Sequence, residues 1–142
     1  MEWIALVAWL LTAVGGFVLL SIWVARGGMQ QAREPGSRIR PGLILSHFAL
    51  AATGLVLWIV YVVTDSDALA WIAFVILLVV AVLGWSMFAI WWRRRQRAAI
   101  AQAADPGTPA EQHFPVAVVA GHGILAVTTV VLVFLAAIGV GS

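Results

Sequence analysis

Four long stretches of the chain contain no Asp, Glu, Lys or Arg: residues 3–25, 41–64, 68–92 and 113–142. Each is longer than the roughly 20 residues that an α-helix needs to cross the hydrocarbon of a bilayer. Only helices or closed barrels satisfy their backbone in lipid, and continuous apolar runs exclude a barrel. The sequence therefore predicts an all-α, integral membrane four-helix bundle with spans at about 3–25, 41–64, 68–92 and 114–140.

The composition supports a membrane location and limits the chemistry. Of the 142 residues, 63% are hydrophobic and only 10% are charged, too few to cover the surface of a water-soluble domain. The chain has no cysteine. This excludes disulfides, iron–sulfur ligation and a covalently attached c-type haem, so a redox centre would depend on histidine or methionine. Glu2 is unlike the start of a cleavable signal peptide, so the first span is expected to remain as a helix.

The basic residues indicate how the helices are oriented. All eight are arginines, and they follow the first and third spans: Arg26, Arg33, Arg38 and Arg40, then Arg93, Arg94, Arg95 and Arg97. By the positive-inside rule both loops are cytoplasmic and both termini lie outside, in a bacterial cell membrane. The positive charge then reflects orientation, so we expect the lipid bilayer, and no nucleic acid, as a partner.

The chain contains an internal repeat. Residues 3–26 align without a gap with residues 71–94 and match at 11 of 24 positions, where apolar composition alone would give roughly three. At a different offset, residues 47–58 align with residues 122–133 and pair His47 with His122. We therefore expect one transmembrane domain of two tandem helical hairpins, residues 1–64 and 68–142, related by a pseudo-twofold axis along the membrane normal.

Small and aromatic residues indicate how the helices pack. Small residues recur at helical spacing and predict close helix contacts: Ala5, Ala8, Thr12 and Gly16 in the first span, and Ala70, Ala73, Ala81 and Gly84 in the third. Tryptophans near the ends of the spans are typical of interfacial anchors: Trp3, Trp71, Trp91 and Trp92. Trp58 and Tyr61 are interpreted as residues of the outer interface.

Two histidines and two glycines lie at similar depth in the membrane. With a rise of about 1.5 Å per residue, His47 and His122 are about 10 and 13 Å from the cytoplasmic boundary. Gly84 and Gly16 are about 13 and 15 Å from it. Because an ionisable side chain in lipid is costly, it usually faces the bundle interior and serves a site. These four residues therefore form the candidate site.

The pattern resembles that of the membrane b-type cytochromes. In that family, axial histidines come from alternate helices of a four-helix bundle and glycines lie on the intervening helices; His47, His122, Gly16 and Gly84 match this arrangement. The resemblance implies an electron-transfer protein in which His47 and His122 are the metal ligands of one haem b, in the cytoplasmic half. One histidine per ligand helix limits the bundle to one such haem.

The resemblance also implies an orientation and a partner. Haem propionates would point towards the cytoplasmic arginines, of which Arg38, Arg40, Arg93 and Arg94 are the candidates. Electrons would be exchanged with a quinone or a larger membrane redox complex. Residues 111–141 are also similar to a group of small actinobacterial membrane proteins of unassigned function, which adds no activity.

Other interpretations of the same residues remain open. The protein can instead be a non-catalytic accessory or assembly subunit whose histidines hydrogen-bond across helices. A transporter or proton path is disfavoured, because such relays usually contain carboxylates or arginines within the membrane. His113 is expected to be a solvated interfacial residue, and Met87 to be a packing residue and not a ligand.

Overall fold

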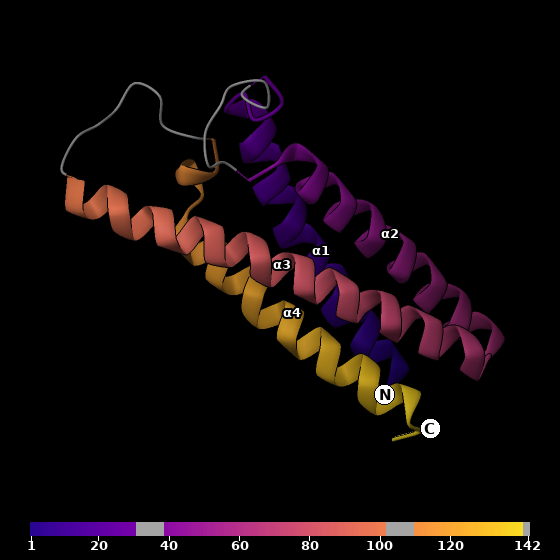
Figure 1. The fold of residues 1–142 in the computed structure, drawn as a ribbon. Helices are drawn as coiled ribbons and strands as arrows, with labels where there is room; N and C mark the ends of the chain where they lie inside the picture. Colours follow the sequence, from indigo (N-terminus) through magenta and orange to yellow (C-terminus); the bar gives the residue numbers. More distant parts are fainter. Residues whose placement is uncertain (31–38, 102–109, 141–142) are drawn as a thin grey trace.

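The computed structural model describes residues 1–30, 39–101 and 110–140, and all regular secondary structure in these ranges is helical (Figure 1). The chain forms four long helices and one short 3-10 helix, which precedes the last of them: α1 (Glu2–Ala25), α2 (Pro41–Thr64), α3 (Asp67–Ala101), η2 (Ala110–His113) and α4 (Val116–Ala137). All four α-helices are long and apolar enough to cross a membrane. The expected all-α bundle of four candidate transmembrane helices is confirmed. Arg33 and Arg38 lie outside the described residues.

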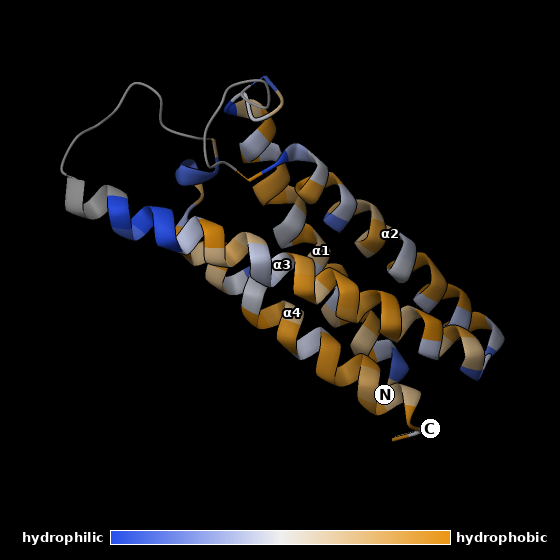
Figure 2. Ribbon diagram, viewed as in Figure 1, coloured by the Kyte–Doolittle hydropathy of each residue, from blue (hydrophilic) through white to orange (hydrophobic). Residues whose placement is uncertain are grey.

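Local sequence explains where the helices begin and end. Pro41 occupies the first turn of α2, where a missing N–H costs little, and Pro115 is the N-cap of α4. Asp65 ends α2 in a left-handed conformation, φ 55°, and its N–H donates to the carbonyl oxygen of Tyr61. The next helix starts at Asp67, so the α2–α3 connection is tight. Helix α3 continues past the expected end at residue 92, through an arginine-rich turn of good helix formers that is hydrophilic in Figure 2.

The helices pack around the bundle in the order α1, α4, α3, α2. The closest packing is between α1 and α4 and between α2 and α3. Helices α2 and α4 therefore lie diagonally across the bundle from each other. The start of α1 and the end of α4 are at one end of the bundle, and the end of α1, the start of α2 and η2 are at the other (Figure 1). The tightest helix pairs thus join one sequence repeat to the other.

The small-residue stripes lie where the helices approach each other. Ala5 of α1 and Ala73 of α3 occupy equivalent repeat positions, and both are fully buried. Ala8 and Ala70 are also buried. The ring of Trp9 in α1 occupies the space beside Gly54 of α2. The prediction that these residues mediate helix contacts is therefore confirmed at these positions.

Three aromatic residues are buried, contrary to the sequence-based expectation. Trp58 and Tyr61 lie inside the bundle, and their ring centroids are 4.8 Å apart. The first turn of α1 covers them, since the indole N–H of Trp58 donates to the carbonyl oxygen of Glu2 at 3.4 Å. Trp91 is 2% exposed, as is Trp23 at the equivalent position of α1. The interfacial reading of these three residues was wrong, because position near a span end does not determine which face points inwards.

Candidate functional site

His47 of α2 is directed towards α3. Its Nδ1 lies 3.0 Å from the carbonyl oxygen of Val80. Its Cε1 lies over Gly84, where an added Cβ would be only 3.2 Å away. The glycine therefore provides the space in which the imidazole ring rests.

His122 of α4 makes the equivalent contacts with α1. Its Nδ1 lies 3.0 Å from the carbonyl oxygen of Thr12. Its Cε1 would be 3.3 Å from a Cβ added at Gly16. Thr12 and Val80 are equivalent repeat positions, as are the two glycines. The internal repeat thus produces two copies of one histidine–carbonyl–glycine arrangement.

These hydrogen bonds determine the histidine tautomers. A carbonyl oxygen only accepts, so the neutral ring carries its proton on Nδ1, which donates to Val80 in one case and Thr12 in the other. Nε2 then carries a lone pair. Among the described residues no group hydrogen-bonds to either Nε2 atom. Nε2 is therefore the ring nitrogen through which each histidine could bind a metal, since metal-binding histidines usually donate a hydrogen bond from the other ring nitrogen.

The two imidazole rings face each other across the bundle. Their centroids are 6.4 Å apart, and their planes are inclined at 67°. Two imidazoles on opposite sides of one metal ion, each with a nitrogen about 2 Å from it, have centroids about 6 Å apart. The observed separation equals that of two histidines bound to one metal, and it also lies within the range of about 4.5–7 Å of two rings in direct contact.

The donor set does not fit a bare metal ion. Within the described residues, no group of three or more His, Cys, Asp or Glu is placed to hold a metal. Two imidazoles leave most coordination positions of a transition metal unfilled. A group that brings its own equatorial ligands would fit this pair better than a free ion.

Side chains at the level of the histidines are less buried than those elsewhere in the bundle. Away from this level, side chains such as Trp9, Trp58 and Val133 form a buried core. No residue is fully buried in the segments around the histidines, which are residues 10–22, 41–53, 81–90 and 112–128. Both histidines are themselves only partly buried. The side chains at this level are therefore less enclosed by neighbouring helices than those of the buried core.

The arginines expected near the site differ in their surroundings. Arg40, at the N-cap of α2, and Arg93 of α3 are both exposed. Arg94 turns inwards and pairs with Glu111, with Nη1 3.4 Å from Oε1. His113 is exposed, as expected for an interfacial residue. The geometry therefore brings together His47, His122, Gly16 and Gly84, whereas Arg40 and Arg93 make no contact with the histidine pair.

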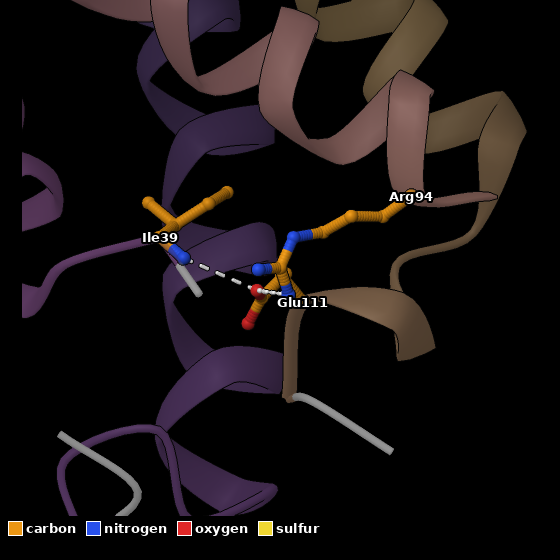
Figure 3. A network of polar contacts seen from close by, with 3 residues as sticks. All are labelled: Ile39, Arg94 and Glu111. Carbon is orange, nitrogen blue, oxygen red and sulfur yellow. Dashed lines mark hydrogen bonds and ion pairs between the residues drawn. The ribbon is translucent and has the colours of Figure 1, made fainter. Parts of the chain in front are cut away.

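Glu111 is a buried polar residue that sequence reasoning missed. It is 1% exposed, on η2, and its Oε1 accepts hydrogen bonds from the backbone N–H of Ile39 at 3.2 Å and from Arg94 (Figure 3). A single glutamate in a polar connection gives no local signal of burial. Its role depends on residues 72 and 17 positions away in the chain.

The fold and the site together define the class of protein: a small multi-pass helical membrane protein with a pair of facing histidines between diagonal helices. Comparison of the chain with known protein families, with curated proteins and with solved structures found no match. The functional argument therefore depends on the geometry of the site.

Proposed function

We propose that this protein is a membrane electron-transfer protein that binds one b-type haem between His47 and His122. The observation that carries the proposal is the facing imidazole pair, with a centroid separation of 6.4 Å and each Nδ1 occupied by a backbone carbonyl. Each Nε2 is left for the metal. This is the arrangement expected of two axial ligands to one iron.

The coordination chemistry favours a porphyrin over other metal groups. A porphyrin supplies four equatorial nitrogens, so two histidines complete six-coordinate iron. The chain has no cysteine, so an iron–sulfur cluster or a covalent c-type haem has no attachment here.

The residues of the chain would hold and orient the group. His47 and His122 would bind the iron through Nε2, and Gly16 and Gly84 leave the space in which the imidazole rings lie. Arg40 and Arg93 give the loop end of the bundle a positive potential, which favours propionates directed towards it. When bound, the haem supplies reversible one-electron transfer at a potential that depends on its ligands and burial.

The position of the pair indicates what kind of partner is needed. By the positive-inside rule, the arginine-rich end is cytoplasmic, so a single site lies in the cytoplasmic half of the membrane. One haem at that depth would not carry electrons from one membrane surface to the other. Electrons would therefore be exchanged with a quinone or a larger membrane redox complex.

A second candidate function has an observation of its own. Each histidine makes a hydrogen bond to a neighbouring helix, from α2 to α3 and from α4 to α1. Such bonds contribute about 0.6–2 kcal/mol within membranes and require only Nδ1. A non-catalytic accessory subunit with structural histidines would use the same contacts and leave Nε2 without a role.

The deciding experiment distinguishes the role of Nδ1 from that of Nε2 in each histidine. Asparagine places an amide N–H near the position of Nδ1 but has no counterpart of Nε2. Haem binding predicts that the purified wild-type protein shows a bis-histidine, low-spin spectrum that sharpens on reduction with dithionite. His47→Asn and His122→Asn should each lose this spectrum while remaining folded, and His113→Asn should retain it.

Two results would contradict the proposal. One is a colourless wild-type protein from haem-replete cells. The other is an unchanged spectrum in both asparagine variants. A structural role instead predicts that His47→Asn is tolerated, whereas His47→Ala destabilises the bundle. It also predicts that neither the wild type nor any variant binds haem.

A further inference from the structure

Two buried N–H groups near the loop end of the bundle have no hydrogen-bond partner within the described part of the chain: Trp91 Nε1 and Gln112 Nε2. Trp91 is 2% exposed, so water does not reach its indole N–H in place of a protein group. Nearly all buried polar groups are satisfied, so unpaired donors indicate a missing acceptor.

The two donors are connected through an ion pair between their neighbours in sequence. Trp91 lies one helical turn before Arg94 on α3, and Arg94 contacts Glu111, which immediately precedes Gln112 on η2. Oε1 of Glu111 already accepts from Ile39 and Arg94. Both unpaired groups are donors, so the partner of each must be an acceptor such as a carboxylate.

The two donors lie on the same side of the histidines. Trp91 is seven residues after Gly84, the residue on which His47 rests, and two helical turns place it about 10 Å nearer the arginine-rich end. Gln112 lies on the same side of His122, before the start of α4. Both donors therefore lie on the arginine-rich side of the histidine pair, which is the side towards which the proposed haem would direct its propionates.

We propose that Trp91 and Gln112 form the propionate-binding subsite of this protein, with the indole and amide N–H groups donating to a propionate carboxylate. The inference rests on the proposed haem site and deepens it. Hydrogen bonds to a carboxylate are charge-assisted and stronger than those to a neutral acceptor. The guanidinium of Arg95, 5.6 Å from the centroid of the Trp91 ring, adds positive charge beside the indole donor.

A haem analogue without carboxylates tests the subsite directly. Apoprotein from haem-deficient cells would be titrated with haem b and with haem b dimethyl ester, whose propionates cannot carry charge. The wild type is expected to bind haem b about tenfold more tightly than the diester. Trp91→Phe and Gln112→Leu should each reduce this ratio several-fold by weakening the binding of haem b alone.

The repeat supplies a matched control. Trp23 occupies the position equivalent to Trp91 and is equally buried, but Gly28 packs directly against its ring, and its nitrogen is not among the unpaired donors. Trp23→Phe should leave the ratio of the two affinities unchanged. Helix content measured by circular dichroism would verify that each variant is folded, and Gln112→Leu tests the subsite without altering an aromatic ring.

The outcomes separate the two proposals. If the wild type binds haem b and its diester equally, or if both variants keep the wild-type ratio, the propionate subsite is wrong while the haem site stands. If the wild type binds neither compound, the haem site fails, and the subsite fails with it.

Discussion

At the scale of single residues, Gly16 and Gly84 explain how a histidine can reach a helical carbonyl. In an α-helix the carbonyl of residue i accepts from the N–H of residue i+4, so Thr12 is paired with Gly16 and Val80 with Gly84. A carbonyl oxygen has a second lone pair. Because the i+4 residue is glycine in both helices, no side chain covers that oxygen and the imidazole can donate to it.

Enlarging these glycines should therefore disrupt the site. In Gly84→Leu and Gly16→Leu the new Cβ would lie 3.2 or 3.3 Å from a histidine Cε1. We expect a loss of about 1–3 kcal/mol in the free energy of unfolding, together with a clear drop in haem per protein, measured by pyridine haemochrome. Gly121→Leu is the control, since a Cβ at Gly121 meets no atom within 4 Å. Full haem occupancy in both test variants would show that the glycines are not required.

The hydroxyl pair next to this site should matter much less. Oγ1 of Thr12 is 3.0 Å from that of Thr129 and 2.8 Å from the carbonyl oxygen of Ala8, and Thr129 makes the same type of bond to Leu125. Two hydroxyl protons can satisfy only two of these three contacts. Thr12→Val and Thr129→Val should each cost about 0.5–1 kcal/mol in unfolding free energy in detergent and leave the haem spectrum intact. A loss of haem would show that the hydroxyls, and not only the Thr12 carbonyl, support His122.

At the scale of elements, a buried carboxylate links η2 to two other segments of the bundle. Glu111 joins η2 to the backbone before α2, at Ile39, and to α3, at Arg94. The ion pair is shielded, with the two side chains 15% and 2% exposed. Glu111 therefore closes the loop end of the bundle by contacts with two other segments.

Removing this carboxylate should loosen the loop end. Glu111→Ala leaves the Ile39 N–H without its acceptor, and we expect a loss of about 2–3 kcal/mol in unfolding free energy. Hydrogen exchange at the Ile39 amide should accelerate and so report the loss locally. Arg93→Ala, at an exposed arginine beside Arg94, should cost no more than about 0.5 kcal/mol. Unchanged exchange at Ile39 in Glu111→Ala would contradict the role assigned to the carboxylate.

At the scale of the whole molecule, the closest helix packing joins the two sequence repeats. Helix α1 packs against α4 and α2 against α3, so each histidine rests on a helix from the other repeat. Neither repeat alone contains a complete histidine–carbonyl–glycine arrangement. The two halves are thus expected to depend on each other for the site.

Splitting the chain tests this dependence. Co-expressed fragments 1–66 and 67–142, divided in the tight α2–α3 connection, should associate and recover the haem spectrum. Either fragment alone should not, because His47 needs the Val80 carbonyl and His122 needs the Thr12 carbonyl. Haem binding by one fragment would show that a self-associated repeat can replace the missing half.

The orientation in the membrane can be tested independently of haem. The segregation of arginine predicts that reporter fusions after Ser66 and after Gln102 lie in opposite compartments, with Gln102 cytoplasmic. Alkaline phosphatase and green fluorescent protein fusions would measure this. Equal signals at both positions would defeat the predicted topology.

Hydropathy, a property of local sequence, predicted much of the fold. Uncharged runs of sufficient length specify spanning helices whatever their neighbours are, and the four helices lie where those runs occur. Spacing along a helix also predicted that His47, His122, Gly16 and Gly84 share one layer. Depth depends only on the rise per residue, so it can be read from one sequence.

Only the tertiary structure decided which faces of the helices meet. In these spans every face is apolar, so hydropathy does not distinguish a lipid-facing side chain from a buried one. Trp58, Tyr61 and Trp91 were misplaced for this reason, and the burial of Glu111 depends on Ile39 and Arg94 far along the chain. The hydrogen bonds of His47 to Val80 and of His122 to Thr12 likewise exist only after neighbouring helices from different repeats bring distant residues together. Long-range packing of side chains, which no local pattern encodes, therefore creates the site.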